Sequence, residues 1–333
     1  MVQRRQVVFA VGIVVTAPWS VAQPRRRLPV IGLLSPDTMP SPERWAASPY
    51  SKRLMELGWI DGGNVVVRQA RADGHEDRLP ALAAELVREE VDVIHALGPE
   101  AAVAAARATK TIPIVFSGVA APVELGLIAS FAKPGGNVTG IAWNGAGEVQ
   151  AAKSLEFLRE IAPAARRLAA VYHTASTETV KGPAYTYPAF VKAAESLGYA
   201  LVTYGVREDA ELDSVFTAIL DGRAEALVAI TSPFTFRNRQ RIIDFANRHR
   251  LPSAFDFRGF VENGGLVSYG PDNAAIVRRS VDHVDRVLRG ARPGELPVEL
   301  PTQFELAINV KTAKLLRLTV PRSMLIRADN VVE

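Results

Sequence analysis

The chain has 333 residues, which is too many for one hydrophobic core of the usual ~100–150 residues, so we expect two domains. An apolar fraction of 48% and a charged fraction of 22% are typical of an ordinary soluble globular protein. The formal net charge is only +4 and is scattered along the sequence, which argues against nucleic acid as a partner.

Residues 1–22 have the pattern of a secretory signal peptide. Arg4 and Arg5 precede an apolar run at 7–17, and small residues end the segment at Ala22. The apolar run is shorter than the ~20 residues that a transmembrane helix needs. We expect cleavage after Ala22 and export to the periplasm as a soluble protein. A buried N-terminal helix or strand is the alternative, and the choice between general and twin-arginine export stays open.

The sequence contains no cysteine. A lipoprotein needs a cysteine at its cleavage site, so we do not expect a lipid anchor. Disulfides and cysteine-ligated metals are excluded for the same reason. The exported protein must therefore be stabilised by a sizeable hydrophobic core, which a chain of this length can build.

Strands and helices alternate along the rest of the sequence. The first run has predicted strands at 30–34, 65–67, 91–96 and 113–116, and predicted helices at 45–57, 77–89 and 98–110. The second run has predicted strands at 168–172, 200–204, 226–230, 252–255, 265–269 and 305–309, and predicted helices at 149–161, 184–197, 211–220, 236–249, 273–288 and 310–316. Such alternation predicts parallel sheets covered on both faces, and the shared period predicts two similar α/β lobes.

The stretch 113–143 connects the two runs. Its apolar start predicts a buried strand, and we expect a short helix at 122–130 and a second strand at 138–143. The Gly-Gly-Asn sequence at 135–137 tolerates positive φ and predicts a turn before that strand. Small residues at 117–120 allow a ligand to approach the backbone, so we expect a ligand site between the lobes.

Sequence motifs for catalysis are missing. The chain has no phosphate-binding loop, no G-x-G-x-x-G after a strand, no G-x-S-x-G nucleophile motif and no H-E-x-x-H. Its five histidines lie in different predicted elements and show no metal-ligand spacing. We therefore predict no catalytic residues, no metal and no cofactor.

Polar and aromatic residues gather instead at the carboxyl ends of the predicted strands. Ligands of open parallel sheets bind at these ends, where helix N-termini present free N–H groups. Taken singly, each of these residues is better explained as a helix cap or turn residue, and Ser35, Ser117, Ser232 and Asp256 all suit caps. Because they recur at matching ends in both lobes, we predict a binding cleft. Its candidate residues are Ser35, Asp37, Gly98, Pro99, Glu100, Ser117, Gly118, Val119, Trp143, Tyr172, Ser232, Phe234, Asp256 and Tyr269.

A small carboxylate in this cleft would need hydrogen bonds to replace its water. The donors we expect are backbone N–H groups at 98–100 and 118–119, with the hydroxyls of Ser35 and Ser117. A ligand amine would need an acid, and Asp256 is the one we expect in preference to Asp37 or Glu100.

Several stretches together resemble a known family. They are 56–62 with Asn64 and Val65, 79–87, 133–140, 264–270, 301–306 and 309–318. From about residue 28 to 333 the chain resembles the ABC-transporter substrate-binding proteins of the tryptophan/tyrosine-binding type. This resemblance implies two Rossmann-like lobes of the type I periplasmic-binding-protein architecture, joined by a hinge. It places lobe 1 at 28–141 plus about 271–292, and lobe 2 at 142–270 plus about 300–333.

The resemblance also implies a function. A protein of this type captures a small molecule in the cleft between its lobes and delivers it to an ABC permease in the inner membrane. Because Ala121 and Asp256 depart from the pattern expected of the family, we expect either an aromatic amino acid or a related small carboxylate. We expect a monomer with no enzymatic activity. A ligand sensor or adaptor, or an enzyme on the same two-lobed scaffold, are the alternatives.

Overall fold

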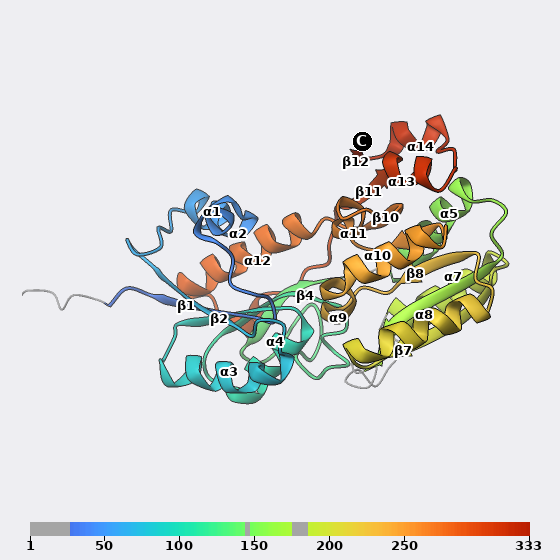
Figure 1. Ribbon diagram of the computed structural model, residues 1–333. Helices are drawn as coiled ribbons and strands as arrows, with labels where there is room; N and C mark the ends of the chain where they lie inside the picture. Colours follow the sequence, from blue (N-terminus) through green and yellow to red (C-terminus); the bar gives the residue numbers. More distant parts are fainter. Residues whose placement is uncertain (1–26, 144–146, 175–185) are drawn as a thin grey trace, which may run out of the picture.

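The computed structural model describes residues 27–143, 147–174 and 186–333, so the expected signal peptide at 1–22 lies outside the described residues. The described chain forms two lobes, each built around one β-sheet (Figure 1). This arrangement confirms the two-lobed α/β architecture expected from the alternation of strands and helices.

The first lobe contains a five-stranded sheet of order β2-β1-β3-β4-β5, and all its neighbouring strands are parallel. Side chains along a strand alternate between the two faces of the sheet, so Leu33 packs on one side of it and Leu34 on the other. Both faces therefore need a cover of helices. The strands are β1 (Val30–Ser35), β2 (Val66–Arg71), β3 (Val93–Leu97), β4 (Ile114–Val119) and β5 (Val138–Ala142).

Helices from both ends of the sequence cover this sheet. On one face α3 and α4 enclose Leu34 and Phe116, whereas α2 and α12 enclose Leu33 and Val115 on the other (Figure 1). The helices of this lobe are α1 (Pro42–Ala47), α2 (Pro49–Glu56), α3 (Leu79–Arg88), α4 (Pro99–Ala108) and α12 (Asn273–Leu288). In the sequence α12 lies between strands of the second lobe, so the chain returns to the first lobe at α12 and then ends in the second.

The second lobe contains a seven-stranded sheet of order β12-β11-β10-β9-β8-β6-β7. Its neighbouring strands are parallel except β10 and β11, which are antiparallel. The strands are β6 (Arg167–His173), β7 (Ala200–Val206), β8 (Ala226–Ala229), β9 (Ser253–Phe255), β10 (Val267–Pro271), β11 (Phe304–Asn309) and β12 (Asn330–Val332).

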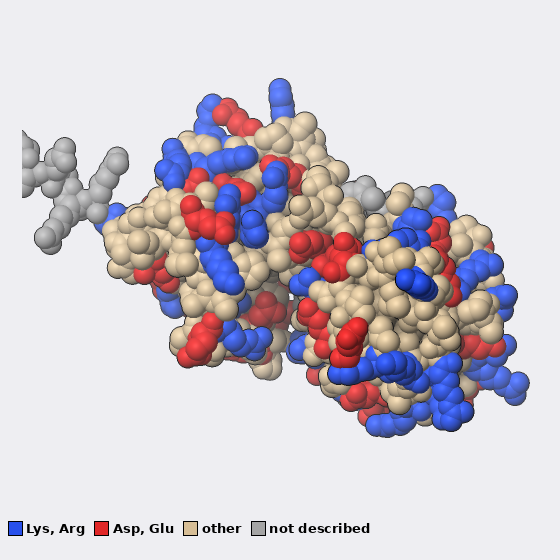
Figure 2. Space-filling view, turned by 90° about the horizontal axis from the view of Figure 1, so that it is seen from above, with Lys and Arg blue, Asp and Glu red and all other residues tan. Residues whose placement is uncertain are grey.

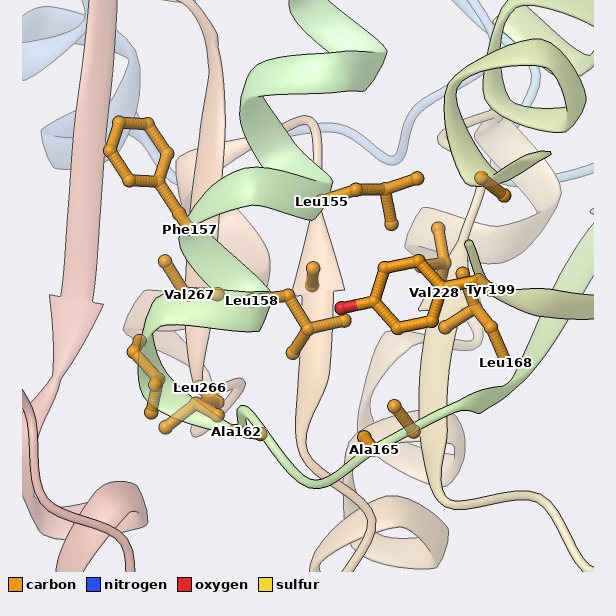
Figure 3. Close-up of a cluster of buried hydrophobic side chains, with 14 of the residues drawn as sticks. Leu155, Phe157, Leu158, Ala162, Ala165, Leu168, Tyr199, Val228, Leu266 and Val267 are labelled. Carbon is orange, nitrogen blue, oxygen red and sulfur yellow. The ribbon is translucent and has the colours of Figure 1, made fainter. Parts of the chain in front are cut away.

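Helices also cover both faces of this second sheet. The first face carries α5 (Gly147–Ile161), α7 (Thr186–Ser196), α13 (Val310–Leu315) and α14 (Arg322–Arg327), and the second carries α8 (Leu212–Asp221), α9 (Pro233–Arg237), α10 (Arg239–Arg248) and α11 (Arg258–Glu262). On the first face, Leu155 and Leu158 of α5 lie over Val228 and Val267 of the sheet (Figure 3). Three short 3-10 helices complete the described elements: η1 (Glu76–Arg78), η2 (Asp209–Glu211) and η3 (Pro293–Glu295).

The chain passes between the lobes after β5, after β10 and between α12 and β11. The last passage runs beside β5. The N–H of Ala142 donates to the carbonyl oxygen of Glu299 at 2.9 Å, and the N–H of Glu299 donates to that of Gly140 at 3.1 Å. These bonds join adjacent connecting segments into a short hinge next to the cleft.

Some expected elements differ in the structure. Residues 122–130 form turns rather than a helix, and Gly126, at φ +66°, has a conformation that a right-handed helix cannot continue. The helix expected at 45–57 is two helices, because Ser48 ends α1 and Pro49 starts α2. The helix expected at 236–249 is likewise divided, at Asn238. The elements α11, α14 and β12 were not predicted.

Candidate functional site

A cavity of about 250 Å³ lies between the lobes, at the carboxyl ends of β3 and β4 in the first sheet and of β8 and β9 in the second. We call it the first cavity. The space-filling view shows a hollow between the lobes (Figure 2). The residues that line the first cavity are Asp37, Leu97, Gly98, Pro99, Ser117, Gly118, Ala120, Trp143, Thr231, Ser232, Phe236, Phe257, Asn273 and Val277.

Three aromatic side chains form a wall of the first cavity. Trp143 follows β5, Phe236 lies in α9 and Phe257 follows β9. The rings of Trp143 and Phe257 meet edge to face at 6.1 Å, and those of Phe236 and Phe257 lie 4.9 Å apart at 59°. Because the wall joins residues from both lobes, an apolar ring bound here would contact both.

A bulge in β4 lies against this wall. The pairing of β4 with β5 shifts register between Ser117 and Val119, and Gly118 between them has φ +77°. A Cβ at Gly118 would lie 3.6 Å from Cε3 of Trp143. The carbonyl oxygen of Val119 accepts a hydrogen bond from the backbone N–H of Trp143 at 3.0 Å. The side chain of Val119 is fully buried. Val119 therefore positions Trp143 instead of lining the cavity itself.

Asp37 is the one charged residue among the described residues that line the first cavity. The Ser35 hydroxyl donates to Oδ2 of Asp37 at 2.9 Å and accepts from the Asp37 N–H at 3.1 Å. Ser35 is fully buried, whereas the side chain of Asp37 is 67% exposed. Ser35 thus holds a carboxylate that is free to meet a ligand cation, and its hydroxyl is not the free donor we expected.

The start of α4 also offers fewer donors than expected. The Gly98 N–H already donates to the Ser117 carbonyl oxygen at 2.9 Å, and Pro99 has no N–H. The prediction of free backbone donors is therefore wrong for these two residues. Burial, together with the nearby Glu76, raises the pKa of Glu100 to about 8, despite a hydrogen bond from its own amide. This shift favours the neutral form of Glu100 near pH 7, and its Oε2 has no hydrogen-bond partner among the described residues.

In the second lobe, residues near one another in sequence point in different directions. Ser232 lines the first cavity but also caps α9, where its hydroxyl accepts from the Thr235 N–H at 3.1 Å. Phe234 is buried in the lobe and stacks on His173 at 4.6 Å, whereas Phe236 lines the cavity. The helical turn between Phe234 and Phe236 thus sends the first into the core and the second into the cleft.

Asp256 lies behind the cavity wall. It is 1% exposed and is not among the described residues that line the cavity. Burial raises its pKa to about 6, although polar groups of Thr231 and its own amide partly oppose the rise. The neighbouring residue Phe257 takes the place at the cleft.

Tyr172 and Tyr269 pack against the core of the second lobe. Tyr269 lies edge to face with Phe157 at 5.4 Å and stacks on Phe304 at 5.9 Å. Its carbonyl oxygen accepts from the Ser154 hydroxyl at 3.0 Å. Neither tyrosine is among the described residues that line the cavity.

Ala120 belongs to the stretch 117–120 where we expected a ligand to approach the backbone. Six further lining residues were not among the candidate site residues: Leu97, Thr231, Phe236, Phe257, Asn273 and Val277. Asn273 and Val277 are one turn apart at the start of α12. Sequence spacing alone could show that they share a helix face, but not that this helix returns to the cleft. Thr231 and Phe257 directly adjoin predicted residues and could have been found by widening each strand end by one position.

Within the described residues, no group of three or more His, Asp or Glu side chains lies close enough to hold a metal ion. No helix in the described parts of the chain reaches the length and hydropathy of a membrane span. Basic and acidic side chains are intermixed on the face shown in Figure 2.

A cleft between two α/β lobes, lined by both and next to a hinge, defines a two-lobed binding protein for small molecules. The sequence matches the ABC transporter substrate binding protein family over residues 46–332. The chain belongs to this family and is a solute-binding protein of an ABC transporter, as the sequence resemblance implied.

Known relatives agree with this assignment. A tyrosine-binding protein of Clostridioides difficile (strain R20291) is 26% identical over 282 residues, which are 85% of this chain and 78% of the relative. A conserved domain protein from Vibrio cholerae has a structure with a TM-score of 0.82 and 26% identity, covering 92% of this chain and 100% of that one. The ABC domain from Streptococcus pneumoniae in complex with L-Trp has a TM-score of 0.81 and 24% identity, with the same coverage.

Proposed function

We propose that this protein is exported to the periplasm and captures an aromatic amino acid in the first cavity for an ABC importer. The observation that carries the proposal is the aromatic wall of Trp143, Phe236 and Phe257, whose residues come from both lobes. A planar ring can stack or meet edge to face with such side chains and gains more than burial alone gives.

Asp37 completes the fit. A ligand ammonium would find one carboxylate at the edge of the first cavity, already held by Ser35. Charge-assisted hydrogen bonds are stronger than neutral ones, so this contact would orient the amino acid. We therefore assign to Asp37 the role that the sequence suggested for Asp256. The descriptions of two relatives, one tyrosine-binding and one in complex with L-Trp, support the same ligand class.

The setting of the protein follows from the same proposal. Cleavage after Ala22 would release a soluble monomer without a lipid anchor, and its partner would be a permease of the inner membrane. Capture by lobe closure requires no nucleophile and no acid–base pair, so no enzymatic activity is proposed. A ligand sensor would use the same cleft. It would differ from a transport protein only in the partner that binds the closed form.

The proposal is tested by calorimetric titration of the mature protein with L-tryptophan and L-tyrosine, using L-leucine and L-aspartate as comparisons. The aromatic pair is expected to bind more tightly than either comparison. Thermal melting gives a second readout, because a ligand at a hundredfold excess over its Kd stabilises the folded protein by about 2.7 kcal/mol. Equal or weaker binding of the aromatic pair would contradict the proposal.

A further inference from the structure

A larger cavity, of about 560 Å³, adjoins the first. We call it the second cavity. The two share Asp37, Leu97, Phe236 and Val277, so a ligand can extend from one into the other. The second cavity is richer in positive charge, because four arginines and two aspartates line it. These residues are Arg44, Arg71, Arg237, Arg239, Asp37 and Asp73.

Two of these arginines, Arg237 and Arg239, belong to the second lobe and already have hydrogen-bond partners. Nη1 of Arg237 donates to the Gly74 carbonyl oxygen at 2.9 Å. Nη1 of Arg239 donates to the Phe236 carbonyl oxygen at 2.8 Å, and its guanidinium lies 4.4 Å from the centre of the Phe236 ring. Both arginines therefore help to hold the wall of the cavity, although Nε of Arg239 is buried without a hydrogen-bond partner among the described residues.

Arg71, at the end of β2, is different. Its side chain is only 8% exposed, and Nε donates to Oε1 of Gln69 at 3.3 Å. Its Nη atoms donate no hydrogen bond to any described residue. The nearest acid is Asp37, and the 3.9 Å between Nη1 and Oδ2 is too long for a hydrogen bond. Burial lowers the pKa of Arg71, and the charge of Asp37 partly offsets the change.

Arg71 therefore presents unused Nη–H groups to the second cavity, and a guanidinium that is largely withdrawn from solvent favours a partner of opposite charge. Arginine presents its donors in a planar fork that matches the two oxygens of a carboxylate. We propose that Arg71 binds a carboxylate of the ligand in the second cavity. This inference rests on the proposed function: the ring lies in the first cavity, the ammonium meets Asp37, and the carboxylate meets Arg71.

The carboxylate can have two sources. Asp37 and Arg71 lie side by side, as do the ammonium and carboxylate of an α-amino acid, so the α-carboxylate fits their spacing. The second cavity is also larger than one carboxylate requires, so a longer ligand could place a distal carboxylate there. A set of three ligands separates these sources: L-tryptophan, L-tryptophanamide and the dipeptide L-tryptophyl-glycine, whose carboxylate is one residue further from the amine.

The test is calorimetric titration of the mature wild type, Arg71→Gln, Arg71→Lys and the control Arg68→Gln. Arg68 lies on the same strand but pairs with Glu85 and Glu89 at the surface. We expect Arg71→Gln to weaken binding of the carboxylate ligand by roughly 10- to 100-fold. Arg71→Lys should lose part of the affinity, and Arg68→Gln none. Binding of the amide should be the same in wild type and Arg71→Gln.

The ligand set identifies the source of the carboxylate. Tighter binding of L-tryptophan than of both other ligands assigns the α-carboxylate, and tighter binding of the dipeptide assigns a distal one. Wild-type affinity in Arg71→Gln, or an equal loss for acid and amide, would overturn the inference. If Arg71→Gln fails to fold, as judged by circular dichroism, the same comparison with Arg71→Lys decides.

Failure of the proposed function gives a different result, because the wild type would then bind none of the three aromatic ligands. In that case wild type and Arg71→Lys are compared by thermal shift with acetate, succinate and glutarate. Stabilisation of the wild type that is reduced in Arg71→Lys supports the carboxylate site. No stabilisation by any of these carboxylates would overturn it.

Discussion

The two lobes meet the cleft with different chemistry. The first lobe supplies Asp37 and Arg71, which are charged, and the glycine bulge at Gly118. The second supplies the rings of Phe236 and Phe257, and its Arg237 and Arg239 already have hydrogen-bond partners. Trp143, which follows β5, completes the aromatic wall. The charged groups of the first lobe are therefore suited to bind the polar head of a ligand, whereas the wall covers its apolar part on closure.

The largest expected effect separates two acids, one in each lobe. Asp37→Asn should weaken binding of L-tryptophan by about 2 kcal/mol, because it removes the charge that faces the ammonium. Asp256→Asn should leave the affinity nearly unchanged, because Asp256 lies behind the wall. Calorimetric titration of both variants measures the difference. A large loss in Asp256→Asn with none in Asp37→Asn would return the role to Asp256.

In the first lobe, the buried acid Glu100 should make the stability of the protein depend on pH. Its pKa is raised from 4.5 to about 8 in the folded protein, so the folded state binds the proton more tightly than the unfolded state. The free energy of unfolding should therefore be highest below pH 4.5 for this group, and its contribution should be lost as the pH rises toward 8.

Glu100→Gln, which cannot ionise, should flatten this dependence and raise the melting temperature at pH 8. Melting curves from pH 5 to 8 for wild type and variant measure it. Affinity for L-tryptophan at pH 7 should change little, because the neutral form of Glu100 is favoured there. Parallel melting profiles in the two proteins would show that Glu100 is ionised in the folded state.

Two phenylalanines on one short helix test the role of the second lobe. Phe236→Leu should weaken ligand binding by about 1 kcal/mol, because it removes an aromatic contact at the cavity. Phe234→Leu should instead lower the stability by about 1–2 kcal/mol, because Phe234 is buried in the core. Titration and denaturant unfolding of both variants separate the effects. The reverse pattern would place the ligand away from α9.

The smallest expected effect concerns closure. Arg237 connects the lobes through the Gly74 carbonyl, but its side chain is 41% exposed, so the bond is worth less than about 1 kcal/mol. Arg237→Gln should increase the radius of gyration of the ligand-free protein in small-angle scattering. The control is Arg241→Gln, because Arg241 bonds Asp209 and Asp213 within the second lobe. Equal radii in all three proteins would show that Arg237 does not hold the lobes together.

The sequence predicted most of the strands, because buried parallel strands are short apolar runs, but it placed the end of β2 at 67, whereas that strand ends at Arg71. It could not predict which side chains face the cleft at the carboxyl ends of the strands. Phe234 faces the core and Phe236 faces the cavity only because they lie on different sides of the same helical turn. The Ser35 hydroxyl is not free for a ligand because it donates a hydrogen bond to Asp37, two residues further along the chain. Arg71 was not considered because its importance depends on burial, which only the packed lobe determines.

The fold presented a similar limit. The antiparallel pairing of β10 with β11 and the return of α12 to the first lobe depend on contacts between distant parts of the chain, and only the family resemblance implied that return. Asn273 and Val277 line the cleft only because of that return. Local periodicity contains no information about such contacts.

A crystal structure of the mature protein with L-tryptophan would show directly where the ligand binds. We expect the indole ring against Trp143, Phe236 and Phe257, with the ammonium within hydrogen-bond distance of Asp37. An indole bound outside the first cavity, or an ammonium paired with another acid, would contradict it.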